Sequence, residues 1–188
     1  MAVLPIRIMG DPVLHAPSAA VQAIDADVRT LVADMYDTMD AAPGVGLAAP
    51  QVGVALRIFT YSYSDDSDTP WRGVLINPEL WMTPLTPGDP DPDHESEGCL
   101  SVPGERFPLR RSERVIITGV DLEKQPIRIE VTGWRARILQ HEFDHLDGVL
   151  YIDRIGDNDY KTVHKIARKR GWGVPGRSWL PGVDDLEA

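Results

Sequence analysis

The chain has 188 residues, of which 43% are hydrophobic and one is a cysteine, and its formal net charge at pH 7 is −10. No apolar run approaches the roughly 20 residues that a membrane-spanning helix needs, so we expect no association with a membrane. A single cysteine excludes an internal disulfide, and the first residues lack the pattern of a signal peptide, so we expect a cytoplasmic protein. No basic face dominates, and we expect no specific nucleic-acid sequence as a partner.

The acidic residues are concentrated in one part of the chain. Residues 61–97 contain nine acidic side chains against one basic side chain, Arg72, and so carry −8 of the net −10. Because the polar stretches 62–70 and 84–94 lie in this segment, we assign the charge to solvated loops and infer nothing about the charge of a substrate. The length predicts one domain over residues 1–188, which is large enough for a hydrophobic core.

The first predicted helix covers residues 24–39, where hydrophobic side chains recur at helical spacing. Asp25 is its expected N-cap, and Pro43 followed by Gly44 marks its end. Strands are predicted at 56–61, 74–76 and 115–120 from their β-branched and aromatic residues, and at 127–131 from alternation of apolar and polar residues. Stretch 84–94 contains four prolines, which exclude a regular element there.

The strongest helical pattern covers residues 134–151. One stripe of side chains contains Trp134, Ile138, His141 and His145, and a second stripe of apolar residues lies on roughly the opposite side. A helix with two such faces is predicted to be buried, with one face on the core and the other lining a site. A last helix is predicted at 159–170, capped near Asp157 or Asn158 and ended by Gly171, and 171–188 is expected to be an irregular tail.

This order of elements predicts an α+β fold, in which mixed or antiparallel sheets surround a central helix and further helices lie toward both ends of the chain. The predicted central helix also contains a motif that occurs in catalytic metal sites. His141 and His145 are one helical turn apart on the same face, where both imidazoles can bind one ion. Glu142 is about 100° further round the helix, where its carboxylate can reach a water molecule instead of the metal. The alternative is a helix that bears two histidines on one face by chance.

Cys99 is the obvious candidate for a third metal ligand. It lies in the sequence Glu97-Gly98-Cys99-Leu100-Ser101 and is the only cysteine in the chain. A lone cysteine is commonly a small buried hydrophobic residue. Here the preceding glycine and a proline-rich acidic loop give the backbone the freedom to turn a thiolate into a site. The three residues together indicate a metal-dependent hydrolase.

A glycine-rich segment runs from Gly44 to Gln51 with the sequence Gly-Val-Gly-Leu-Ala-Ala-Pro-Gln. The string satisfies a dinucleotide-binding fingerprint, but that fingerprint needs a strand before the glycines and a helix after them. Here a helix precedes and a strand-like segment, 52–61, follows, so a nucleotide site is rejected. The segment is either a loop against which a substrate can lie closely, with the Gln51 amide as a donor, or a plain tight turn.

These three segments, 44–51, 97–101 and 140–148, occur in the order seen in the peptide deformylase family, and the chain resembles that family over roughly residues 3–170. The resemblance implies a hydrolase that removes the formyl group from the N-terminal formyl-methionine of new proteins and releases formate. It implies that Cys99, His141 and His145 bind the metal, that a metal-bound water is the nucleophile, and that Glu142 is the general base and acid. The metal in this family is usually Fe²⁺, although Zn²⁺, Ni²⁺ or Co²⁺ would suit the same ligands.

The resemblance also assigns residues to the substrate. The Gln51 side chain and the Leu100 backbone N–H would bind the oxyanion, and Val45 and Gly46 would hold the peptide in an extended pose. Ile138 and Trp134 would bound an apolar pocket for methionine, and Arg106 would lie near the peptide path. Asp144 and Arg111 are expected to form a pair that orients the ligand helix.

The partners implied are N-formyl-methionyl peptides on nascent chains. A transient contact with the ribosome through the last helix is a further expectation from its basic residues, Lys161, Lys165, Arg168, Lys169 and Arg170. Two alternatives stay open at this point. One is a zincin-like metallopeptidase, which would need a third ligand downstream of the helix, such as His164. The other is a catalytically silent binding module of the same fold.

Overall fold

The computed structural model of the protein describes residues 2–64, 71–184 and 186. Three α-helices are present in these residues: α1 (Ala26–Ala41), α2 (Gly133–Leu146) and α3 (Asp157–Arg170). The strands are β1 (Ile6–Arg7), β2 (Gly46–Ala48), β3 (Ile58–Tyr63), β4 (Trp71–Met82), β5 (Ser96–Cys99), β6 (Val102–Pro108), β7 (Arg114–Val120), β8 (Pro126–Thr132) and β9 (Ser178–Trp179). Short 3-10 helices cover Pro12–His15, Ala49–Val52 and Tyr151–Asp153.

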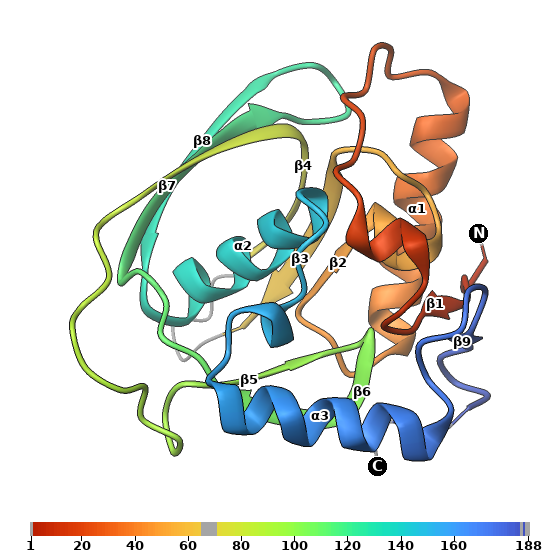
Figure 1. Cartoon of the computed structure of the whole chain (residues 1–188). Coiled ribbons are helices and arrows are strands. Elements are labelled where there is room, and N and C mark those ends of the chain that lie inside the picture. Colours follow the sequence, from red (N-terminus) through yellow and green to blue (C-terminus); the bar gives the residue numbers. More distant parts are fainter. Residues whose placement is uncertain (1, 65–70, 185, 187–188) are drawn as a thin grey trace.

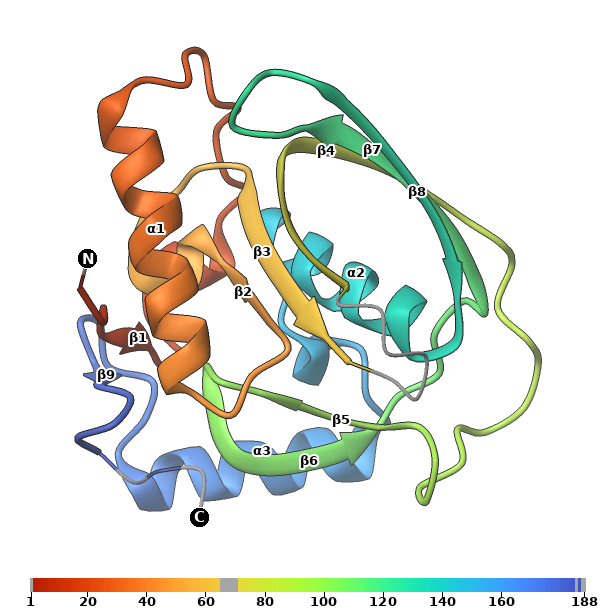
Figure 2. The same ribbon diagram turned by 180° about the vertical axis from the view of Figure 1, so that it is seen from behind.

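The strands form three antiparallel sheets, which confirms the predicted α+β class. The largest has five strands in the order β2-β3-β4-β7-β8, and β5 with β6 and β1 with β9 form two-stranded sheets. Figure 1 and Figure 2 show the five-stranded sheet curving around α2, while α3 lies on the outside beside β5 and β6. The helix that carries the histidine motif is therefore central, as expected.

Helix α2 is buried because its apolar side faces the concave side of the large sheet. Side chains of the helix and the sheet form one core cluster, whose fully buried members include Phe59, Leu75, Ile117 and Leu139. On β8 the alternation seen in the sequence places Ile127, Ile129 and Val131 against this cluster, while the residues between them are exposed. A second cluster lies beneath α1 and extends to Cys99, Leu100 and the tail after α3.

Several predicted boundaries need correction. Helix α1 spans 26–41 instead of 24–39, although Asp25 is its N-cap and accepts a hydrogen bond from the Val28 N–H at 3.0 Å. Helix α2 ends at Leu146 and not at residue 151, because Gly148 adopts φ +74° and packs against the backbone of Ala16. The apolar pattern continues past this point only because residues 150–152 are also buried, but outside the helix.

The expected cap of the last helix is also wrong. Helix α3 begins at Asp157, so its N-cap is Gly156, and it ends at Gly171 in the left-handed conformation, as expected. No strand was expected between 96 and 108, where β5 and β6 form a hairpin. In the tail, Ser178–Trp179 form the short strand β9 that pairs with β1, whereas the rest of the described tail has no helix or strand.

The two predicted loops have different outcomes. Residues 62 and 63 belong to β3, and 65–70 lie outside the described residues. Stretch 84–94 contains no helix or strand, as its prolines predict. Among the described residues, no helix is both long and apolar enough to span a membrane.

Candidate active site

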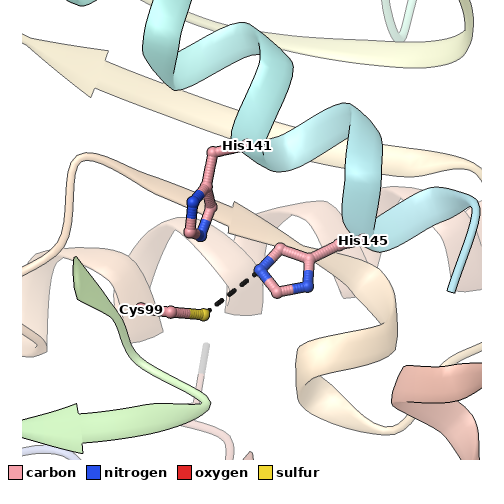
Figure 3. A group of neighbouring side chains, drawn as sticks. All are labelled: Cys99, His141 and His145. Atoms are coloured by element: carbon pink, nitrogen blue, oxygen red, sulfur yellow. Dashed lines mark hydrogen bonds between the residues drawn. The ribbon is translucent and has the colours of Figure 1, made fainter. Parts of the chain in front are cut away.

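Three predicted metal ligands meet between α2 and the end of β5. Helix α2 supplies His141 and His145, and β5 ends at Cys99, whose sulfur points toward the two rings (Figure 3). One ligand atom from each residue lies within 4.8 Å of the other two, and Cys99 Sγ is 3.3 Å from His145 Nε2. Tetrahedral bonds of about 2.3 Å to sulfur and 2.0–2.1 Å to nitrogen would place such a pair roughly 3.6 Å apart. The three residues therefore fit a single divalent metal ion.

The two histidines are prepared for metal binding by their surroundings. His141 Nδ1 lies 3.1 Å from Glu97 Oε2, and this contact fixes the ring with its other nitrogen, Nε2, on the side of the site. Burial and the neighbouring His141 together lower the pKa of His145 well below its ordinary value. His145 is thus neutral at pH 7, which is the form that coordinates a metal.

A buried network of ion pairs supports the ligand helix from behind. Arg111 donates to Glu97 at 2.8 and 3.0 Å and to Asp144 at 2.6 Å, which confirms the predicted Asp144–Arg111 pair. Arg137 donates to Glu97 at 2.7 Å, and Arg154 donates to both oxygens of Asp144. Burial would raise the pKa of Glu97, but the hydrogen bonds from His141 and Arg111 outweigh it and hold this pKa well below its usual range. The carboxylate that orients His141 therefore stays ionised.

Glu142 lies beside the ligands and is almost completely buried, with 4% of its surface exposed. Its Oε2 atom is buried and makes no hydrogen bond to any residue that the structure describes. Burial raises the pKa of Glu142 to about 7. A buried carboxylate oxygen with no protein partner is suited to hydrogen-bond a water molecule or a reacting group.

Gly46 leaves room for this carboxylate. A Cβ atom at position 46 would overlap Glu142 Oε1 and lie 2.7 Å from Glu142 Cγ. The absence of a side chain at position 46 of β2 therefore allows the Glu142 carboxylate to approach the strand. From the sequence we expected the glycines to admit a substrate, and the structure adds this contact with Glu142.

Gln51 and the turn after Cys99 form the opposite wall. The Gln51 carbonyl accepts a hydrogen bond from the Ala48 N–H at 2.8 Å, which orients the amide nitrogen toward the site. That nitrogen lies 3.3 Å from Ser101 Oγ and 3.7 Å from Cys99 Sγ. The Leu100 side chain packs against Gly44, where a Cβ would be 2.8 Å from Leu100 Cδ1.

A cavity of about 260 Å³ opens above the ligands. Every site residue predicted from the sequence except His145 lines it; these residues are Val45, Gly46, Gln51, Cys99, Leu100, Arg106, Trp134, Ile138, His141 and Glu142. His145 is 1% exposed and lies beneath the cavity floor. Ile138 is buried on the wall, whereas Trp134 is 47% exposed at the rim.

Sequence reasoning missed several residues of the site. Arg137 and Tyr63 also line the cavity, and Arg137 stacks over Trp134 at 5.4 Å from the ring centroid. Tyr151 packs against His141 with ring centroids 6.0 Å apart, and its hydroxyl donates to the Glu105 carbonyl. Arg137 follows a predicted pocket residue by three positions on the helix, which is a signal that could have found it.

A zincin-like enzyme would need a third metal ligand downstream of α2, and the structure does not favour His164 as that ligand. His164 lies on α3, and its ring pairs with Tyr160 at 4.2 Å. Among the described residues, the histidines of α2 share a metal-sized group only with Cys99.

Two imidazoles and a cysteine sulfur that fit one metal ion, beside a buried carboxylate at a largely apolar cavity, define a metal-dependent hydrolase. Comparisons with known proteins identify the family. The family model described as polypeptide deformylase matches residues 3–161. A peptide deformylase of Mycolicibacterium vanbaalenii is 50% identical over 98% of this chain and 97% of its own length. One of Rhodococcus opacus is 50% identical over 97% of this chain and 95% of its own length.

Solved structures agree with the sequence relatives. The crystal structure of peptide deformylase from Ehrlichia chaffeensis has a TM-score of 0.78 and 30% identity, and the match covers 90% of this chain and 97% of that chain. The structure from Thermus thermophilus has a TM-score of 0.75 and 34% identity over 89% of this chain and 94% of that chain. The chain belongs to the polypeptide deformylase family, and it is an enzyme.

Proposed function

We propose that this enzyme hydrolyses the formyl amide of N-formyl-methionyl peptides, consuming water and releasing formate and a free amino terminus. The observation that carries the proposal is the convergence of Cys99, His141 and His145 beside the buried carboxylate of Glu142. Cys99, His141 and Glu142 line one cavity, His145 shares the metal-sized group with Cys99 and His141, and the chain matches deformylases along almost its whole length.

Cys99, His141 and His145 would hold the metal. When bound, a divalent metal ion supplies a Lewis acid that polarises a carbonyl group and lowers the pKa of water toward about 7. The chain contributes the rest of the chemistry through the side chains that surround the cavity.

Glu142 is the residue that would move the proton. Its partnerless Oε2 takes a proton from the attacking water and then delivers it to the departing amine nitrogen. The pKa of Glu142, raised to about 7 by burial, suits both roles near neutral pH. Gly46 supports this role because it leaves space for the carboxylate.

The Gln51 amide and the Leu100 backbone N–H would bind the oxyanion that forms on the formyl oxygen. Gln51 is held at its carbonyl by Ala48, so its NH₂ group faces the cavity, where it donates to Ser101 Oγ and makes a longer contact with Cys99 Sγ that the oxyanion would replace. Removal of one such donor costs about 2.7–4 kcal/mol of barrier in other hydrolases.

The apolar wall of the cavity would receive the methionine side chain. Ile138 and Trp134 lie on this wall, Val45 and Gly46 offer backbone groups to an extended peptide, and Arg106 lies across Gly98 at the mouth. The relatives from Ehrlichia chaffeensis and Synechococcus elongatus were solved in complex with actinonin. We expect actinonin to compete with the formyl peptide in the same cavity here.

Fe²⁺ is the proposed metal in the cell, and Zn²⁺, Ni²⁺ or Co²⁺ would occupy the same ligands. With Fe²⁺ beside the Cys99 thiolate, exposure to peroxide should inactivate the enzyme. Metal analysis of protein purified without oxygen tests the identity of the metal, and full activity of the iron form after peroxide would contradict the iron proposal.

Nascent chains are the proposed substrates, which places the enzyme in the cytoplasm. A transient ribosome contact would use exposed cations of α3, among them Lys161, Lys165 and Lys169. Arg170 is already paired with Glu105 at 3.0 Å, so it contributes less. Reversal of the lysine charges should abolish salt-sensitive co-sedimentation with ribosomes and leave hydrolysis of a short peptide unchanged. Unaltered co-sedimentation would remove α3 as the contact.

The central test compares formate release from a formyl-Met peptide by wild type and by Glu142→Gln. Loss of a general acid-base should lower kcat by about 10²–10⁴-fold while the metal content stays the same. Glu123→Gln is a suitable control because Glu123 lies on the surface, paired with Arg29 at 2.8 Å. Rates of Glu142→Gln close to wild type would exclude Glu142 from the mechanism.

A further inference from the structure

The segment after α3 returns to the back of the active site. It leaves the helix at Gly171, buries Trp172, and reaches β9, where Trp179 lies opposite Ile6 of β1. Figure 1 shows this segment running beside β1, close to the start of the chain. The family match ends at residue 161, so this segment lies outside the part that the family model describes.

Trp179 makes a direct contact with the turn that follows Cys99. The side chain is only 3% exposed, and its indole Nε1 donates to the Leu100 carbonyl at 2.8 Å. One residue further on, the Ser101 carbonyl accepts a hydrogen bond from the Met9 N–H, also at 2.8 Å. Segments from near both ends of the chain therefore hold two consecutive carbonyl groups of this turn.

The inner side of the turn is held as well. The Leu100 side chain fills the space beside Gly44, and Ser101 Oγ accepts a hydrogen bond from the Gln51 amide. The Leu100 peptide nitrogen and carbonyl belong to adjacent peptide planes that meet at its Cα. The Leu100 carbonyl is held by a hydrogen bond and the Leu100 side chain is held by packing. The Leu100 N–H therefore has little freedom to rotate.

We propose that Trp179 is a positioning residue for deformylation: its indole N–H holds the Leu100 carbonyl and thereby aims the Leu100 N–H at the formyl oxygen. This inference rests on the oxyanion role of Leu100 proposed above. A phenylalanine ring could fill much of the same buried space, so packing alone does not require the indole nitrogen. The bond to a buried carbonyl does require it, because an unpaired buried carbonyl is costly.

The size of the effect follows from geometry. Trp179 is not among the residues that line the cavity, so its loss should loosen the proposed oxyanion donor without removing it. Displacement of a reacting group by about 1 Å can cost about 10²-fold in rate. We therefore expect about a tenfold fall in kcat for Trp179→Phe, less than the 10²–10³-fold loss that removal of an oxyanion donor causes.

The experiment compares Trp179→Phe with Trp172→Phe in the full chain with its metal bound. Trp172 is a buried tryptophan of the same segment, its ring lies beneath the Arg170 guanidinium, and the indole hydrogen bond to Leu100 comes from Trp179. Both variants should lower Tm. Only Trp179→Phe should lower kcat, with KM changed by less than about twofold because the methionine pocket is untouched.

A second measurement does not depend on activity. The backbone amide resonances of Leu100 and Ser101 should shift in Trp179→Phe and stay in place in Trp172→Phe. If Trp179→Phe fails to fold, site-specific replacement of Trp179 with benzothienylalanine keeps the ring size and substitutes sulfur for the indole N–H. The same amide shifts and the same loss of kcat are then expected.

Two results would overturn the proposal. One is a kcat for the Trp179 variants within twofold of wild type, and the other is an equal loss of kcat in Trp172→Phe. If wild type releases no formate, the deformylation itself fails, whereas the amide resonances still report whether Trp179 holds the turn.

Discussion

The three predicted metal ligands come from two regions, helix α2 and the turn at residues 99–101. The contacts that position the ligands differ between these regions. On α2, His141, Glu142 and His145 are placed by the geometry of one helix, and only five residues of sequence determine their spacing. In the turn, Cys99 and Leu100 are placed by contacts with residues 9, 44, 51 and 179. The positions of the α2 side chains follow from local helix geometry, whereas the conformation of the turn depends on contacts with distant parts of the fold.

This difference has a consequence for perturbation. A substitution on α2 should affect mainly the function of the substituted residue. A change near the turn should affect Cys99 and Leu100, the proposed oxyanion donor, together, because the two residues are adjacent in the chain. The following predictions test this contrast, in order of decreasing effect.

The largest effect is expected when a ligand from either region is removed. Cys99→Ala and His145→Ala should each weaken metal retention by more than the about 10–100-fold that supporting residues contribute. Metal content after dialysis, measured together with formate release, gives the result. His164→Ala is the control, since His164 lies on α3 beside Tyr160. Retention of the metal by Cys99→Ala would mean that α2 alone forms the site.

The next largest effect is expected at Gly46, which contacts α2 from the sheet. The methyl group of Gly46→Ala would overlap the Glu142 carboxylate and displace it. We expect a fall in kcat of about 10²-fold with the metal retained, because a displacement of about 1 Å is enough for that loss. Gly156→Ala is the matched control, since nothing lies within 4 Å of a Cβ there. Normal activity of Gly46→Ala would show that Glu142 tolerates movement.

Glu97 connects the two regions, because it lies on β5 and orients His141 of α2. Replacing a group that orients a metal ligand typically costs about 10–100-fold in metal affinity, and we expect Glu97→Gln to fall in this range. Metal titration of the apo proteins measures it. An affinity equal to that of wild type would show that α2 orients its own ligands.

The same variant has a predicted pH dependence. The pKa of Glu97 in the folded state lies below the value near 4.3 of an unfolded chain, so its stabilising effect is present above that pH and is lost as the pH falls. The Tm difference between metal-free wild type and Glu97→Gln should therefore be largest near pH 7 and should shrink below about pH 4. A difference that stays constant from pH 7 to pH 3 would contradict the ionised state of Glu97.

The smallest effect is expected at Ser101, which anchors the Gln51 amide to the turn at 3.3 Å. Ser101→Ala removes one neutral hydrogen bond, worth about 0.5–1.5 kcal/mol, so kcat should fall by about 2–10-fold. The Ala48 N–H still holds the other end of Gln51, which limits the loss. Ser112→Ala is a matched control, because Ser112 is a buried serine that donates to the Thr83 carbonyl. A loss above 10²-fold would mean that Ser101 itself takes part in the reaction.

The contrast between the two regions also explains how much could be predicted from the sequence. The metal-facing stripe of α2 and its burial between layers follow from helical periodicity, which a sequence displays directly. Cys99 could be chosen as the third ligand because it is the only cysteine in the chain. The helical stripe also indicated Trp134 and Ile138, whereas Leu100 and Arg106 could be assigned to the substrate only because three motifs occur in the order of a known family.

What the sequence did not reveal depends on distant partners. Glu97 orients His141, which is 44 residues away in the sequence. The Trp179 side chain donates a hydrogen bond to the Leu100 carbonyl, which is 79 residues away. The β5–β6 hairpin was missed because Gly98 and Pro103 weaken its strand pattern, while burial and pairing stabilise it in the fold. No local pattern records such contacts.

The space left by the two glycines beside the active site will affect how a mutational scan of this protein is interpreted. Positions 44 and 46 carry no functional group, yet Leu100 and Glu142 occupy the volume that their side chains would take. In a growth or turnover screen, both positions should tolerate almost nothing but glycine. A ranking by sensitivity alone would then place them among the reactive residues, although neither has a side chain and their intolerance comes from the space that Leu100 and Glu142 fill.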